Sequence, residues 1–82
     1  MNDNNAYKYY LEDLGHLIQE IVTNWKLEKS KKKLGEYDFG YEMALNQIVS
    51  LLQNQAKAFE IDLKSINLDK IDTGKDLLTH EG

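Results

Sequence analysis

The residues best suited to chemistry in this chain are Glu12, His16 and Glu20, which recur at a spacing of four. On a helix, that spacing places all three side chains on one face. Such a face can ligate a metal ion, or it can hold pairs of opposite charge. Di-iron bundles use a Glu-x-x-His spacing instead, which is missing here. The triplet lies beside the apolar positions of its segment, so we expect local charge pairs, no metal site and no cofactor.

Catalytic signatures are missing elsewhere. The chain has no cysteine, and Ser30, Ser50 and Ser65 do not lie in the glycine-flanked turn that exposes a nucleophilic serine. It has no glycine-rich phosphate loop. His80 lies close to the C-terminus, and we find no pair of carboxylates on an apolar face where burial would raise a pKa. We therefore predict that the protein is not an enzyme and has no catalytic residues.

The segment from Lys26 to Lys33 holds five lysines and one glutamate, whereas the whole chain has a net charge of −4. Lysines at the end of a helix complement the negative end of its dipole. They can also contact phosphates, although the chain has no arginine, the usual bidentate reader of guanine and phosphate. Nucleic-acid binding is therefore an alternative function, which would use Lys29, Lys31, Lys32 and Lys33.

Acidic and aromatic side chains suggest a protein partner. We interpret the acidic residues as lying on the outer faces of the helices, where they serve solubility or dock a basic protein. Several tyrosines and Phe39 lie near the starts of the two helical segments, and exposed aromatic residues often anchor interfaces. We predict a non-enzymatic interaction protein, a regulator or inhibitor of the compact bacterial or phage type. Its expected partner-binding residues are Tyr9, Tyr10, Phe39, Glu36, Asp38 and Glu42.

Two long amphipathic segments would position these residues. Apolar positions at helical spacing predict a helix over about 5–32 and a second over about 37–59. The chain contains no proline to interrupt them. Gly35 is expected to end the first helix in a left-handed conformation, so that the second folds back antiparallel. The expected core and dimer positions are Tyr7, Leu11, Leu14, Ile18, Ile21, Trp25, Tyr41, Leu45, Ile48, Leu52 and Phe59.

The remainder is less regular. We predict a short helical segment over about 62–78, capped by Asp62 and by Asp72 or Thr73, that packs over the hairpin. Residues 79–82 are expected to form a disordered tail. Gly15 is expected on the solvent side of its helix, with a close approach of a neighbouring backbone as the alternative. Gly40 indicates either a close helix approach or a frayed first turn.

These segments predict an all-α fold: one helical domain over residues 1–82, with an antiparallel two-helix hairpin and a short C-terminal helical segment. The apolar stripes are wider than a lone hairpin covers, and no disulfide can reinforce so small a domain. We therefore expect a homodimer that forms a four-helix bundle, with a three-helix monomer as the alternative. No apolar run is long enough for a membrane span, and we expect a cytoplasmic location without membrane association.

Overall fold

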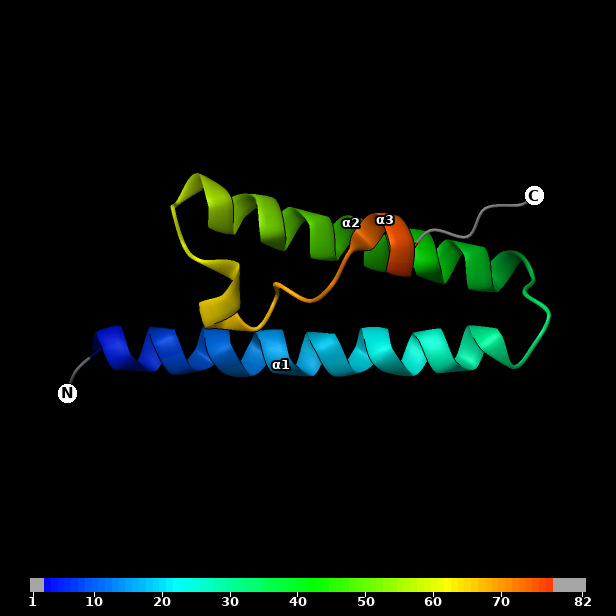
Figure 1. The fold of residues 1–82 in the computed structure, drawn as a ribbon, viewed down its shortest axis with the longest axis horizontal. Helices are drawn as coiled ribbons and strands as arrows, with labels where there is room; N and C mark the ends of the chain where they lie inside the picture. Colours follow the sequence, from blue (N-terminus) through cyan, green and yellow to red (C-terminus); the bar gives the residue numbers. More distant parts are fainter. Residues whose placement is uncertain (1–2, 78–82) are drawn as a thin grey trace.

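The computed structural model describes residues 3–77 and consists of helices joined by turns. Helix α1 (Asp3–Ser30) and helix α2 (Glu36–Ala58) form an antiparallel hairpin (Figure 1). The chain then returns along the hairpin through the 3₁₀ helix η1 (Leu63–Ile66) and the short helix α3 (Thr73–Asp76). Residues 3–77 contain no strand. The predicted all-helical architecture, with two long helices and a shorter C-terminal helical part, is confirmed.

The turn between the long helices differs from the prediction. Helix α1 ends at Ser30, and Gly35 lies directly before α2 with φ −111° and ψ −172°. The Asp38 carboxylate accepts a hydrogen bond from the Gly35 amide at 2.9 Å. The expectation of a left-handed Gly35 that closes the first helix is therefore wrong. The first-turn carboxylate of α2 binds this amide, so Gly35 opens the second helix instead.

The C-terminal segment begins its helical turns where predicted. Asp62 accepts a hydrogen bond from the Lys64 amide at 3.1 Å and caps η1. Asp72 accepts hydrogen bonds from the Gly74 and Lys75 amides at 3.0 and 3.3 Å and caps α3. Both carboxylates satisfy amides that have no partner inside so short a helix. The predicted tail, residues 79–82, lies outside the described residues.

The core lies on one side of the hairpin, between the two long helices and the returning segment. Val49 and Leu77 have no exposed surface at all. The buried apolar residues are Val22, Trp25, Val49, Ala56, Ile66, Leu68, Ile71 and Leu77. Half of them belong to residues 66–77, so the C-terminal segment is part of the core, in agreement with the expectation that it packs back over the hairpin.

Amide side chains from α2 hold this segment in place. Gln53 Nε2 donates to the carbonyls of Leu68 and Ile71 at 3.0 and 2.8 Å. Asn46 Nδ2 donates to the carbonyls of Thr73 and Leu77 at 3.0 and 3.2 Å. These bonds satisfy backbone carbonyls that an irregular, partly buried segment leaves without a partner.

The expected solvent exposure of Gly15 is also wrong, and the alternative, a close neighbouring backbone, is what the structure has. This residue is buried, and a Cβ atom built on it would lie 1.7 Å from the Ile66 carbonyl oxygen. The adjacent Asn67, at φ 63°, donates from Nδ2 to the Glu12 carbonyl at 2.9 Å. Only glycine allows α1 and η1 to approach this closely. A Cβ on Gly40 would meet no atom within 4 Å, so no close helix approach occurs there.

Candidate protein-interaction surface

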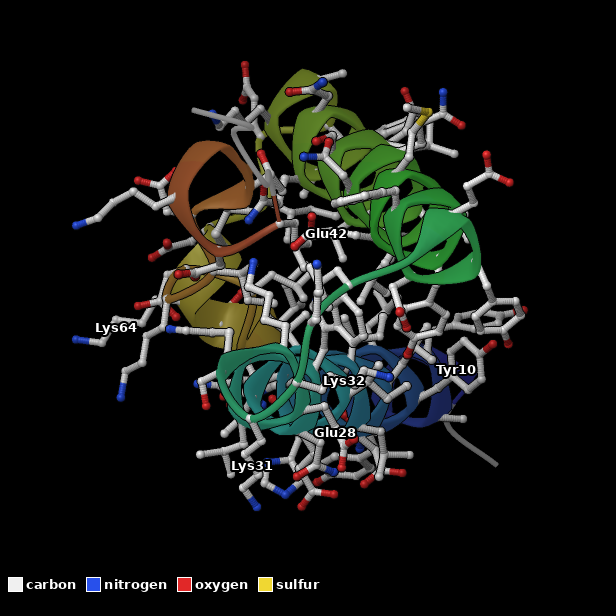
Figure 2. The ribbon with its side chains drawn as sticks, turned by 90° about the vertical axis from the view of Figure 1, so that its right-hand side faces the viewer. Tyr10, Glu28, Lys31, Lys32, Glu42 and Lys64 are labelled. Atoms are coloured by element: carbon white, nitrogen blue, oxygen red, sulfur yellow. The ribbon has the colours of Figure 1, made fainter. Side chains whose placement is uncertain are left out.

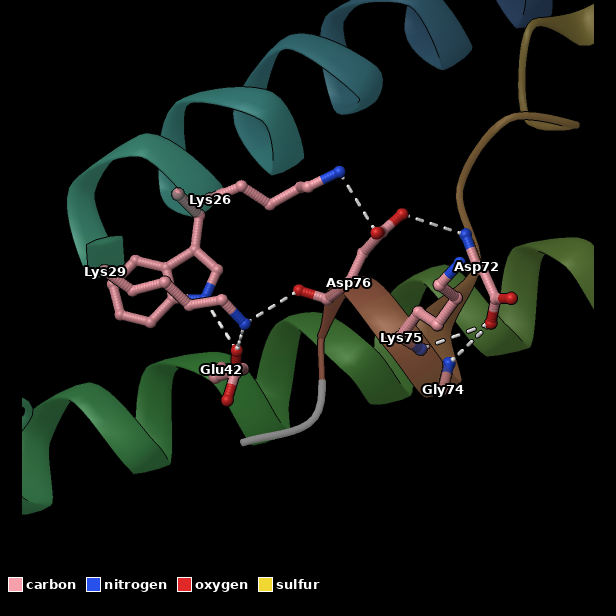
Figure 3. Close-up of polar contacts among 8 residues, drawn as sticks. Lys26, Lys29, Glu42, Asp72, Gly74, Lys75 and Asp76 are labelled. Atoms are coloured by element: carbon pink, nitrogen blue, oxygen red, sulfur yellow. Dashed lines mark hydrogen bonds and ion pairs between the residues drawn. The ribbon is translucent and has the colours of Figure 1, made fainter. Parts of the chain in front are cut away.

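A buried polar cluster links both long helices to α3. Trp25 Nε1 donates to Glu42 Oε2 at 2.9 Å, and Lys29 Nζ forms an ion pair with the same oxygen (Figure 3). Lys29 also donates to the Asp76 carbonyl at 3.0 Å, and Lys26 pairs with the Asp76 carboxylate at 3.1 Å. The cluster therefore connects residues 25–29 of α1, the first turns of α2 and the end of α3. Because its groups satisfy one another, it is a structural clamp.

Glu42 is therefore not a surface acid, and its expected role in partner binding is wrong. Only 3% of the residue is exposed. It lies on the same stripe of α2 as Val49 and Ala56, at intervals of seven. A lone carboxylate would be costly to bury, but the Trp25 and Lys29 donors compensate for its lost hydration.

The lysine segment is largely occupied by contacts within the chain. Lys29 belongs to the buried cluster, the exposed Lys26 pairs with Asp76 at its edge, and Lys32 pairs with Asp38 at 3.0 Å. Lys31 and Lys33 are exposed and form no ion pair with another described residue. Of the four lysines considered for nucleic-acid contact, two thus remain uncommitted.

Two carboxylates near the turn have lowered pKa values. The Gly35 amide, followed by the Lys32 ammonium, lowers the pKa of Asp38 below its ordinary value of 3.8. Burial acts to raise the pKa of Asp76, but the Asp72 amide and the Lys26 ammonium outweigh it and lower the pKa below 3.8. Both groups are ionised at neutral pH and act as anionic partners within the fold.

The Glu12, His16 and Glu20 face makes one contact of the expected kind. His16 Nε2 lies 3.2 Å from Glu20 Oε2, and both side chains are well exposed. Within residues 3–77, no group of three histidine or acidic side chains is close enough together to hold a metal ion.

The surface best suited to binding is an apolar face on the side of the hairpin opposite the C-terminal segment. Figure 2 shows Tyr10 on this side and Lys64 of η1 on the other. Along each helix, the residues of the apolar face recur at alternating spacings of three and four, as in the seam of a helical bundle. The apolar face consists of Tyr7, Tyr10, Leu14, Leu17 and Ile21 from α1 and Tyr37, Tyr41, Ala44, Ile48 and Leu51 from α2, together with Phe59 directly after α2.

Two hollows show that both helices contribute to this one face. Leu14 of α1 and Phe59, directly after α2, line a hollow of about 140 Å³ that is almost entirely apolar and that also borders residues of the core. Ile21 of α1 and Tyr41 of α2 line a second hollow of about 310 Å³ nearer the turn, which is also bordered by the polar residues Asn24, Glu28, Lys32 and Asp38. Trp25 also lines the second hollow, and its ring centroid lies 5.0 Å from that of Tyr41.

The predicted core and dimer positions divide into two groups. Trp25 is buried, and Leu11, Ile18, Leu45 and Leu52 pack against the core. The others belong to the apolar face: Leu14 is half-buried, and Tyr7, Ile21, Tyr41, Ile48 and Phe59 are exposed in the single chain.

The remaining candidates for partner binding are scattered. Tyr10 lies on the apolar face, whereas Tyr9 is exposed on a different side of α1. Glu36 is exposed, and Phe39 is half-buried. Asp38 is engaged with Gly35 and Lys32. The expected acidic and aromatic surface is thus not continuous, and the apolar face is the larger feature.

Among residues 3–77, no helix has the length and apolar character needed to cross a bilayer. Comparison of the chain with known protein families, with curated proteins and with solved structures finds no match.

Proposed function

We propose that this protein is a non-enzymatic helical interaction protein, a regulator or inhibitor that works by binding another protein in the cytoplasm. The apolar face is the observation that supports the proposal. Nine of its large side chains are between 39% and 83% exposed. Single chains rarely leave more than a few hundred Å² of contiguous apolar surface in water.

The pattern of the face favours a helical partner. The alternating spacings of three and four continue over more than two turns on each helix, and such stripes pack against other helices by inserting side chains between theirs. Two added helices would complete a four-helix bundle, and homodimerisation is part of the proposal. The acidic residues outside the face, such as Asp13 and Glu36, would then stay in water.

One charge placed on the apolar face tests this function. Ile48→Glu adds a carboxylate to the face, and Tyr9→Glu is a matched control at an exposed position of α1 outside it. In sedimentation and in capture from native extract with mass spectrometry, Ile48→Glu should lose the associations of the wild type, while Tyr9→Glu keeps them. Equal behaviour of both variants, with unchanged helicity, would contradict the proposal.

The alternative, a nucleic-acid accessory protein, would depend on Lys31 and Lys33, the two uncommitted lysines of the turn. Lysine contacts to phosphate are strongly weakened by salt. A gel shift that is lost in added salt and in the Lys31→Gln/Lys33→Gln double variant would support the alternative. Retained protein capture by that double variant would support the main proposal.

A further inference from the structure

We infer that a second copy of this chain covers the apolar face, and that the two copies run antiparallel with their lysine-rich turns at opposite ends. This inference rests on the proposed function, because it names the partner of the same face. Two independent observations support it: the area of the face and the charge at its two ends.

The area of the face matches what a stable dimer requires. Nine of its large side chains are exposed by 39–83%, and a fully exposed side chain of this size offers roughly 150–250 Å². The face therefore presents on the order of 1,000 Å², compared with about 800 Å² per partner in a standard interface. The same face on a second copy has the same extent, and a two-fold interface pairs like with like.

The chemistry of the face also fits a copy of itself. The face residues carry no charge, so a strongly basic or acidic partner would find no complementary group within the seam. The almost entirely apolar hollow beside Leu14 suits a protruding apolar side chain, and the face itself supplies exposed side chains of this kind, such as Tyr10.

Charge at the two ends of the hairpin selects the orientation. A two-fold axis can relate two stacked hairpins in two ways. An axis parallel to the helices brings both turns to the same end of the dimer. An axis perpendicular to the helices, across the face, places the turns at opposite ends. Residues 26–42 at the turn carry five lysines and four acidic residues, and Asp76, which pairs with Lys26, brings the formal charge there to zero. Residues 3–13 at the open end carry three acidic residues and one lysine, a formal charge of −2. The axis across the helices keeps the two negative open ends apart, whereas the axis along the helices brings them together, so repulsion between like charges favours the first arrangement.

This orientation places α1 antiparallel to α1 of the second copy. Leu17 is near the middle of the face and should then lie close to its own equivalent. With the other axis, α1 faces α2 of the second copy, and Leu17 lies closer to Ile48. These two arrangements therefore predict different pairs of neighbouring residues.

The chain has no cysteine, so one introduced thiol reports on one position. We would oxidise three samples: Leu17→Cys, Tyr9→Cys, and an equimolar mixture of Leu17→Cys with Ile48→Cys. In the mixture, the Ile48→Cys chain carries an added tag, so that mixed and like dimers separate on a gel. We expect Leu17→Cys to become a linked dimer, Tyr9→Cys to stay single, and the mixture to give only like pairs. Sedimentation of the wild type should give twice the chain mass of 9.5 kDa.

Several results would overturn the inference. Mixed Leu17–Ile48 dimers, with no self-linked Leu17→Cys, would place both turns at the same end. A wild type that sediments as a single chain, with Leu17→Cys left unlinked, would remove the second copy as the partner. In that case, loss of protein capture by Ile48→Glu alone would still support the proposed function. Equal capture by all variants would contradict both the proposed function and the dimer.

Discussion

Trp25 and Glu42 are 17 positions apart in the chain, yet the indole Nε1 donates a hydrogen bond of 2.9 Å to the buried Glu42 carboxylate. The bond joins α1 to α2 beside the turn, where Lys29 also pairs with Glu42. This carboxylate is therefore held by a neutral donor and a cation at once. The contact fixes how α1 and α2 pack against each other beside the turn.

Replacing Glu42 with alanine should destabilise the protein by about 3 kcal/mol, because Lys29 then stays partly buried without its anion. Glu42→Gln keeps an acceptor for Trp25 and should cost less. Urea unfolding, followed by Trp25 fluorescence, measures both. Glu36→Ala removes an exposed carboxylate of the same helix as a control. Similar losses for Glu36→Ala and Glu42→Ala would contradict the account of the cluster.

Two glycines should respond in opposite ways to the same substitution. Gly15→Ala places a Cβ against the Ile66 carbonyl, so α1 and η1 must separate and the free energy of unfolding falls. Gly40→Ala lies in open space inside α2 and should stabilise the protein by up to about 1 kcal/mol through helix propensity. Thermal unfolding of both variants tests the pair. A stabilising Gly15→Ala would mean that the close approach is absent.

The C-terminal segment should behave as part of the core. Leu77→Ala removes a side chain with no exposed surface and should cost about 2–5 kcal/mol. Leu27→Ala makes the same chemical change at an exposed position of α1, outside the apolar face, and should cost much less. Chemical denaturation compares the two. Equal, small effects would mean that the segment does not contribute to the fold.

Stability should decrease in acid because of the lowered pKa values. A carboxylate whose pKa is lower in the folded protein stabilises it above the unfolded pKa, and this contribution is lost as the pH falls through the folded value. For Asp38 and Asp76 the loss begins near their ordinary value of 3.8 and continues below it. Melting temperatures between pH 7 and pH 2.5 should fall less steeply for Asp76→Asn than for the wild type. Parallel curves would show that Asp76 does not contribute.

The helices themselves could be predicted because they depend on local properties. The apolar spacing and the absence of proline indicated two long helices, and Asp62 and Asp72 begin the later turns because each carboxylate binds amides two or three positions ahead. These interactions involve neighbouring residues, so they can be predicted from the sequence alone.

The buried side of each helix could not be identified in this way. Both long helices have apolar side chains on more than one side, and the side that became the core includes Gly15, Lys29 and Glu42, which hydropathy assigns to the surface. Gly15 is buried because Ile66 approaches it, and Glu42 because Trp25 and Lys29 supply donors. All of these partners come from other elements of the fold.

The sequence by itself therefore determined which residues form helices, since helix formation depends on contacts between near neighbours. Only the tertiary structure decided which stripe of each helix is buried by the C-terminal segment and which is left as the apolar face. The physical reason is that burial depends on residues distant in the chain, whose packing and hydrogen bonds offset the cost of removing glycine backbone and charged groups from water.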